Sequence, residues 1–146
     1  MVVQRTTTAD GHVQIKGIRR GMVFWADVPP PATQGREQHN EPGKPRPWII
    51  VSSDKLHQRR TNVLAVPVTT REIDSFPGGN VFLDVSDATP LATDAPRFEG
   101  KGTALTEQLR VLAHSRLKGP PAAVITRMKM AEIDAGLLYV LGIELR

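Results

Sequence analysis

The sequence contains no cysteine among its 146 residues. A disulfide framework, a thiolate zinc site, an iron–sulfur cluster and a cysteine nucleophile are therefore all excluded. Aromatic residues are also scarce, at 5%. No apolar run approaches the length that spans a bilayer, since runs such as Trp48 to Val51 are far too short. The N-terminus lacks the apolar stretch of a signal peptide, so we expect a cytoplasmic protein without membrane contact.

Histidines are few and scattered, at positions 12, 39, 57 and 114, and their spacing matches no common metal site. The sequence has no Walker-type glycine motif for nucleotide phosphates. Ser52 and Ser53 lack the Gly-x-Ser-x-Gly context of a hydrolase nucleophile. We therefore expect neither a metal nor a cofactor.

Charge is unevenly distributed along the chain, which carries a net +4. Residues 1–60 hold ten Lys/Arg against five Asp/Glu, residues 61–100 two against six, and residues 101–146 seven against four. The segments therefore carry +5, −4 and +3. Such a layout is typical of a polyanion-binding face, and equally of charges that are simply solvated. The length suits a single domain with a real core.

Alternating and continuous apolar runs predict short strands, and twelve glycines and twelve prolines argue against a helical bundle. The expected strands lie around residues 21–28, 48–53, 62–69, 80–85 and 102–112, with Pro67 marking an edge or a bulge. One C-terminal helix follows Pro120 and Pro121, with Thr126 as N-cap and Gly142 at its end. Because βα alternation is missing, we predict a mainly β fold with a helix, built as a small, strongly bent antiparallel β-barrel. Residues 1–18 have little to bury and are expected to form a flexible N-terminal extension of a domain spanning residues 19–146.

Two of the expected strands carry polar residues at their ends. Arg46 opens one strand and Thr69 closes the next. If these strands pair, the arginine lies near the threonine, and a guanidinium with a hydroxyl is a reasonable phosphate-binding pair. The simpler interpretation is that an Arg-Pro after a loop only caps a strand.

An ordered set of segments resembles the MazF/PemK (Kid) family of toxin endoribonucleases. The set consists of residues 20–28 (RGMVFWADV), Glu37-Gln38, residues 44–52 (KPRPWIIVS), Pro67-Val68-Thr69, residues 106–112 (TEQLRVL) with 115–117, and the helix segments 130–134 and 140–143. The matches run in order from Gly21 to Gly142 and cover most of the chain. None is decisive alone.

The resemblance implies the SH3-like barrel of PemK/CcdB-type toxins and a toxin of a type II toxin–antitoxin system. Such toxins cleave single-stranded RNA (mRNA) without a metal, and their motif residues carry over to Arg46 and Thr69 as the catalytic pair. The resemblance also implies a homodimer that binds RNA in a basic groove. A cognate MazE-like antitoxin would inhibit it with an acidic, otherwise disordered tail.

Further residues are candidates for RNA contact, and each also has a simpler explanation. Loop polarity accounts for Glu37 and Gln38 about as well as a place over the RNA groove does. For the basic candidates, solvated surface charge is the ordinary explanation. For Gln108, the ordinary explanation is a structural role in holding its strand to a neighbouring one. The candidate RNA-binding residues are Glu37, Gln38, Lys44, Lys55, Arg59 and Gln108. The general base is left open between Glu37, His39 and solvent.

Two departures from the family pattern and two rival functions remain at this point. The stretch between Gln38 and Arg46 is longer than usual, and Trp48 stands where a small residue is more usual. One rival is a noncatalytic nucleic-acid-binding or protein-binding barrel. The other is a gyrase-poisoning toxin of the same fold, which acts through an aromatic-bearing tail, whereas this chain has no aromatic residue after Tyr139.

Overall fold

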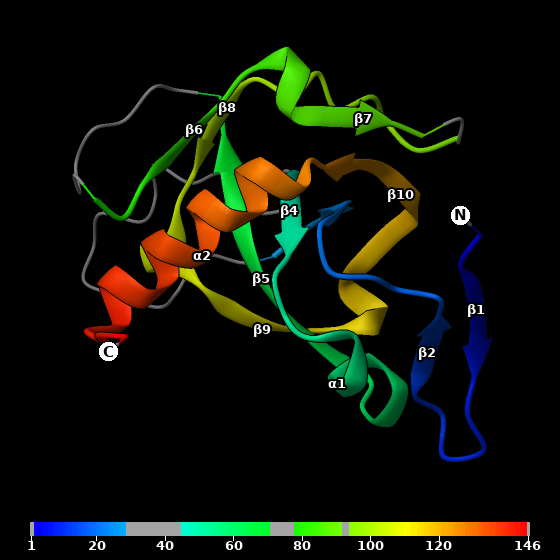
Figure 1. The fold of residues 1–146 in the computed structure, drawn as a ribbon. Helices are drawn as coiled ribbons and strands as arrows, with labels where there is room; N and C mark the ends of the chain where they lie inside the picture. The colour runs from blue at the N-terminus through cyan, green and yellow to red at the C-terminus, as the bar shows by residue number, and fades with distance from the viewer. Residues whose placement is uncertain (1, 29–44, 71–77, 92–93, 146) are drawn as a thin grey trace, which may run out of the picture.

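Short strands are the main secondary structure of the computed structural model, which describes residues 2–28, 45–70, 78–91 and 94–145 (Figure 1). The strands are β1 (Gln4–Thr7), β2 (Val13–Lys16), β3 (Met22–Ala26), β4 (Arg46–Ile50), β5 (Asn62–Thr69), β6 (Val81–Leu83), β7 (Ala88–Pro90), β8 (Gly102–Ala104), β9 (Arg110–Ala113) and β10 (Leu117–Ile125). The α-helices are α1 (Asp54–Arg59) and α2 (Arg127–Leu141), and the 3-10 helices are η2 (Val85–Asp87), η3 (Thr106–Gln108) and η4 (His114–Arg116).

The main sheet is antiparallel and curled, as the sequence predicts. Its strands follow the order β6-β8-β5-β4-β3-β10-β7, and β9 pairs with β5 beside β8. Figure 1 shows the sheet bending around itself, with α2 lying across one side. The expected mainly β fold with a C-terminal helix is therefore confirmed.

Each face of the central strands packs into its own apolar cluster because side chains alternate along a strand. Val23, Ile49 and Val66 are directly paired across β3, β4 and β5, and they pack with Met130 and Ile133 of α2. On the opposite face lies a second cluster, which contains Phe24, Trp48, Ile50, Ala65 and Leu117. The sheet therefore has no face that is free of apolar packing.

The N-terminal residues differ from the expected extension with little to bury. β1 and β2 pair as an antiparallel hairpin, and the side chain of Ile15 is only 1% exposed. Ile15 joins the second cluster, and its N–H donates to Nδ1 of His114 at 2.9 Å. The guanidinium of Arg5 donates to the carbonyl of Leu117 at 2.7 Å. These partners lie far along the chain, so no local sequence pattern indicates them.

β10 passes through Pro120 and Pro121, where the sequence predicts only an interruption. Its pairing with β3 shifts register between Lys118 and Ala123, so the two prolines lie within a break in the ladder. A proline has no N–H to donate and is tolerated at such an irregularity. The sequence also does not predict α1. This six-residue helix is capped by Ser53, whose Oγ accepts the N–H of Leu56.

The boundaries of α2 confirm the caps that the sequence predicts. Thr126 is the N-cap and its side chain accepts the N–H of Lys129. Gly142 ends the helix in the left-handed conformation at φ 70°, where glycine is favoured. Within the described residues, no helix combines the length and apolar character needed to cross a membrane.

Candidate functional site

Arg46 and Thr69 lie at one end of two neighbouring strands. β4 and β5 pair antiparallel, with Trp48 opposite Pro67 and Ile49 opposite Val66. Continuing that register by two residues places Arg46 opposite Thr69. Directly opposed residues point to the same face of a sheet. The register therefore directs the two residues that the sequence predicts as a phosphate-binding pair toward the same end and the same face of the sheet.

The pair belongs to a row of residues that crosses five strands of the curled sheet. Ala26 of β3 lies opposite Arg46, Thr103 of β8 lies opposite Thr69, and Phe82 of β6 lies opposite Thr103. Thr103 and Ala26 are fully buried, whereas the side chain of Phe82 is 48% exposed. No sequence motif indicates that Thr103 and Phe82 belong to this row. The alternation of Phe82 with Val81 and Leu83, both buried, is the one local signal that points to an outward-facing aromatic residue.

Backbone features hold Thr69 in place at this end of β5. A Cβ added to Gly102 would lie 2.1 Å from the carbonyl oxygen of Thr69, so only glycine permits this approach. Pro67 lies where the neighbour of β5 changes from β9 to β8, and its carbonyl accepts the N–H of Leu105 at 3.0 Å. This break explains how a strand with neighbours on both sides accepts a proline. The sequence predicts an edge or a bulge at Pro67, whereas the structure shows an internal strand position where the neighbouring strand changes.

The chemistry available at the pair is electrostatic and hydrogen-bonding. Arg46 and Thr69 are both partly buried. A guanidinium carries a permanent charge and a planar fork of donors that matches phosphate oxygens, and a hydroxyl both donates and accepts. Partial burial strengthens such interactions by lowering the local dielectric constant. The arrangement therefore suits binding of a phosphate and stabilisation of added negative charge on it.

The other predicted RNA-binding residues lie in three places. Gln108 is on η3, which connects β8 and β9 along β5, and its side chain is exposed. Lys55 and Arg59 are on α1, which follows the far end of β4, so the structure does not place them beside Arg46. Glu37, Gln38 and Lys44 lie outside the described residues, as does His39.

A serine, a histidine and an aspartate also meet near α1, and their geometry indicates a structural role. Oγ of Ser52 is 2.6 Å from Nε2 of His57, and Nδ1 of His57 is 3.7 Å from Oδ1 of Asp54. Ser52 accepts the N–H of Leu64, and Nδ1 of His57 is 3.2 Å from the carbonyl of Ile18. Ser52 and His57 are only 5% and 6% exposed, and the polar atoms of both side chains are engaged by these partners within the fold. Burial lowers the pKa of His57, opposed by the Ile18 carbonyl and by Asp54.

Ligands for a metal ion do not gather in the described part of the chain. No group of three or more His, Asp or Glu side chains there could hold an ion.

Comparison with known proteins assigns the family. The model of the "PemK-like, MazF-like toxin of type II toxin-antitoxin system" family matches residues 19–141. The "Endoribonuclease MazF2" of Mycobacterium bovis is 29% identical over 128 residues, which cover 86% of this chain and 98% of that protein. A mycobacterial endoribonuclease solved with its cognate antitoxin has a TM-score of 0.63 at 22% identity, covering 89% of this chain and 100% of the other.

A MazE–MazF structure from Deinococcus radiodurans has a TM-score of 0.62 at 21% identity, covering 87% of this chain and 98% of that chain. At these identities the solved structures establish the fold, and the family match covers the strands and the helix that carry the site. The strands β4 and β5, which carry Arg46 and Thr69, lie inside the matched residues. The chain belongs to the PemK-like, MazF-like toxins of type II toxin–antitoxin systems.

Proposed function

We propose that this toxin is an endoribonuclease that cleaves single-stranded mRNA at selected sequences, with Arg46 and Thr69 as its catalytic pair. The observation that supports the proposal is the register of β4 and β5, which sets Trp48 opposite Pro67 and, if continued by two residues, runs through Arg46 and Thr69. Relatives that bear the name endoribonuclease align over most of the chain, which supports the same activity here.

In the proposed reaction the substrate supplies the nucleophile. A ribose 2′-hydroxyl attacks the adjacent 3′-phosphate, and the 5′-oxygen of the next nucleotide leaves, which requires one proton to be removed and one to be donated. Arg46 stabilises the extra negative charge on the pentacoordinate phosphate, and it is a poor base because its pKa exceeds about 12. Thr69 orients the phosphate through its hydroxyl. The base is then Glu37, His39 or solvent.

The catalytic assignment is tested with purified protein and a long single-stranded RNA in EDTA. The wild type is expected to cut at selected sites, and sequencing the cut ends identifies the recognised bases. Arg46→Ala and Thr69→Ala should each reduce cleavage by at least about a hundredfold, the magnitude of losing one transition-state donor. Both variants should keep the wild-type circular dichroism spectrum and melting temperature.

The controls separate this proposal from other functions of the same fold. Arg46→Lys keeps the charge but loses the fork, so it should recover only part of the activity. Full activity in both alanine variants would rule out the assigned pair. RNA binding without cuts by the wild type would indicate a noncatalytic module, and inhibition of DNA supercoiling without cuts would indicate a gyrase poison.

The proposal extends to the partners of the toxin. A relative of the same fold is solved with its cognate antitoxin, which supports a MazE-like antitoxin for this chain. The excess of positive charge in residues 1–60 suits both RNA and an acidic inhibitory tail. We also propose a homodimer that acts in the cytoplasm, where mRNA is present.

A further inference from the structure

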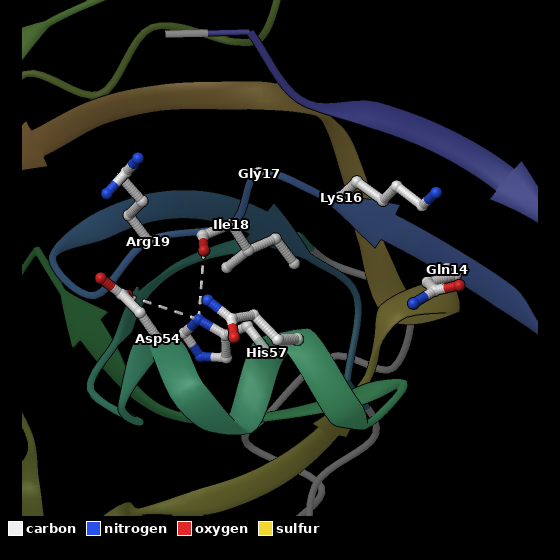
Figure 2. A pocket seen from close by; sticks show the side chains of 8 residues that line it. Gln14, Lys16, Gly17, Ile18, Arg19, Asp54 and His57 are labelled. Atoms are coloured by element: carbon white, nitrogen blue, oxygen red, sulfur yellow. Dashed lines mark hydrogen bonds and ion pairs between the residues drawn. The ribbon is translucent and has the colours of Figure 1, made fainter.

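An open pocket of about 350 Å³ lies between the N-terminal hairpin and α1. Its lining comes from Gln14 and residues 16–19 on one side and from Asp54, His57 and Gln58 of α1 on the other. Figure 2 shows the side chains of Lys16 and Arg19 on opposite sides of this pocket, with His57 and Asp54 rising from α1 between them. The family match begins at residue 19, so most of the hairpin side lies outside it.

Two exposed cations, Lys16 and Arg19, line this pocket, and two more, Lys55 and Arg59, lie on α1 outside the lining. These four residues are defined here as the α1 cationic surface. The two on α1 are four residues apart and therefore project from the same side of the helix. None of the four forms an ion pair within the part of the chain that the structure describes.

The single acidic residue in the pocket lining is already engaged. Oδ1 of Asp54 accepts the backbone N–H of Arg20 at 2.8 Å and lies 3.7 Å from Nδ1 of His57. The cations on either side of it therefore dominate the local potential, and a concave surface concentrates that potential.

We propose that the α1 cationic surface binds the phosphate backbone of single-stranded RNA, in a segment separate from the phosphate that is cleaved. This proposal rests on the proposed function. The lining offers cations and the amides of Gln14 and Gln58 but no exposed aromatic or aliphatic anchor, since Ile18 is 4% exposed. Protein partners bind chiefly through buried apolar anchors, whereas RNA backbone binding needs cations and polar donors. The surface therefore suits nucleic acid better than a polypeptide.

The position of the surface agrees with a role outside the cutting site. Arg46 begins β4, and α1 follows the other end of that strand, a separation of roughly 13 Å along the strand. An RNA that leaves the Arg46 site along the barrel reaches α1 only if it extends several nucleotides. The surface should thus add affinity for long RNA and have no effect on short substrates.

The test uses the full chain and the double variant Lys55→Gln/Arg59→Gln, with Arg97→Gln/Arg127→Gln as a matched loss of two exposed cations elsewhere. Binding of poly(U) RNA is measured over a range of salt concentrations. We expect the α1 variant to bind roughly tenfold more weakly, and its log–log salt slope to be shallower by about 0.7 for each lost phosphate contact. The matched variant should behave as the wild type.

A cleavage assay separates this proposal from the catalytic one. An RNA trimmed to the recognised site, with no flanking nucleotides to reach α1, should be cut at the wild-type rate by the α1 variant. If the wild type cuts no RNA but the α1 variant still loses poly(U) affinity and salt slope, the catalytic proposal fails and the surface stands. Unchanged poly(U) affinity and salt slope in the α1 variant would overturn the proposal that this surface binds RNA. If the α1 variant lost binding only to polyglutamate, the proposal would also be overturned, because the ligand would then be an acidic polypeptide.

Discussion

His114 is fully buried, and its two ring nitrogens have different environments. Nδ1 accepts the N–H of Ile15, so the proton of the neutral ring is on Nε2, which has no hydrogen-bond partner in the described structure. Burial, followed by the charges of His57 and Arg5, lowers the pKa of His114 from 6.5 to about 4. A protonated ring would lose the bond to Ile15 and carry an unpaired buried charge. The folded protein therefore holds this histidine neutral.

This environment predicts a loss of stability in acid. The lowered pKa means that the unfolded chain takes up a proton at a higher pH than the folded protein does. The contribution of His114 is complete above pH 6.5 and is lost as the pH falls from 6.5 toward 4, by about 3 kcal/mol in all. Urea unfolding at several pH values measures it. His114→Asn, which keeps an acceptor near Nδ1, should remove most of this dependence.

The matched control for the acid prediction is His12→Asn, because the side chain of His12 is 67% exposed. That variant should retain the pH dependence of the wild type. If His114→Asn lost stability between pH 6.5 and 4 as steeply as the wild type, another group would be responsible.

The second prediction at the scale of single residues concerns the stability and activity of a Gly102 variant. Its φ of 143° and the 2.1 Å approach of an added Cβ to the Thr69 carbonyl make alanine incompatible with the backbone. Gly102→Ala should therefore lower the free energy of unfolding by about 3 kcal/mol or more and reduce RNA cleavage by displacing Thr69. Thermal unfolding and the RNA assay measure both effects.

Gly119→Ala is the comparison for Gly102. Gly119 also has a positive φ, of 62°, but an added Cβ would meet nothing within 4 Å. It should cost only the conformational penalty of about 1 kcal/mol and leave cleavage unchanged. Equal losses in the two variants would mean that the contact with Thr69 has no effect of its own.

At the scale of elements, the β1–β2 hairpin is joined to the barrel by side chains distant in sequence. Ile15 is buried in the second apolar cluster. Hydrogen bonds also join the hairpin to the barrel, from Arg5 to the carbonyl of Leu117 and from the N–H of Ile15 to His114. Just after the hairpin, the carbonyl of Ile18 lies within hydrogen-bond distance of His57. A hairpin alone is marginally stable in water, so these contacts hold it in place.

Removing the hairpin tests whether it is part of the folded unit. Replacement of residues 1–16 by a single methionine should lower the free energy of unfolding by about 2 kcal/mol, because it withdraws Ile15 from the core. Ile15→Ala should cause a similar loss with the hairpin present, whereas Thr7→Ala, at an exposed position, should change little. A deletion with the wild-type urea midpoint would restore the interpretation of residues 1–18 as a flexible extension.

The elements differ in how far local sequence predicts them. α2 was predictable at both ends, because an N-cap threonine and a C-terminal glycine act through hydrogen bonds and dihedral angles within one turn. β10 was not, because Pro120 and Pro121 resemble a break when read locally. Only the paired β3 shows that the strand continues past an irregular ladder. Strand propensity depends on the neighbouring strands more than helix propensity depends on its surroundings.

At the scale of the whole molecule, the curled sheet divides the cations between two ends. Arg46 lies where β3, β4 and β5 bring their ends together, and α1 carries Lys55 and Arg59 beyond the opposite end of β4. The described cations of residues 1–60 therefore do not all lie on one surface. A sum of charges over a segment cannot show this division, because antiparallel strands reverse the direction of the chain.

The sequence by itself determined the fold class and the family resemblance, and it indicated the candidate pair Arg46 and Thr69, because alternation, caps and an ordered set of motifs are local or linear features. Only the tertiary structure decided the places of Lys55, Ile15 and His114. His114 meets the backbone of Ile15 across 99 residues of chain. Such a contact depends on the long-range pairing of strands and on the burial that follows from it, which no window of sequence contains.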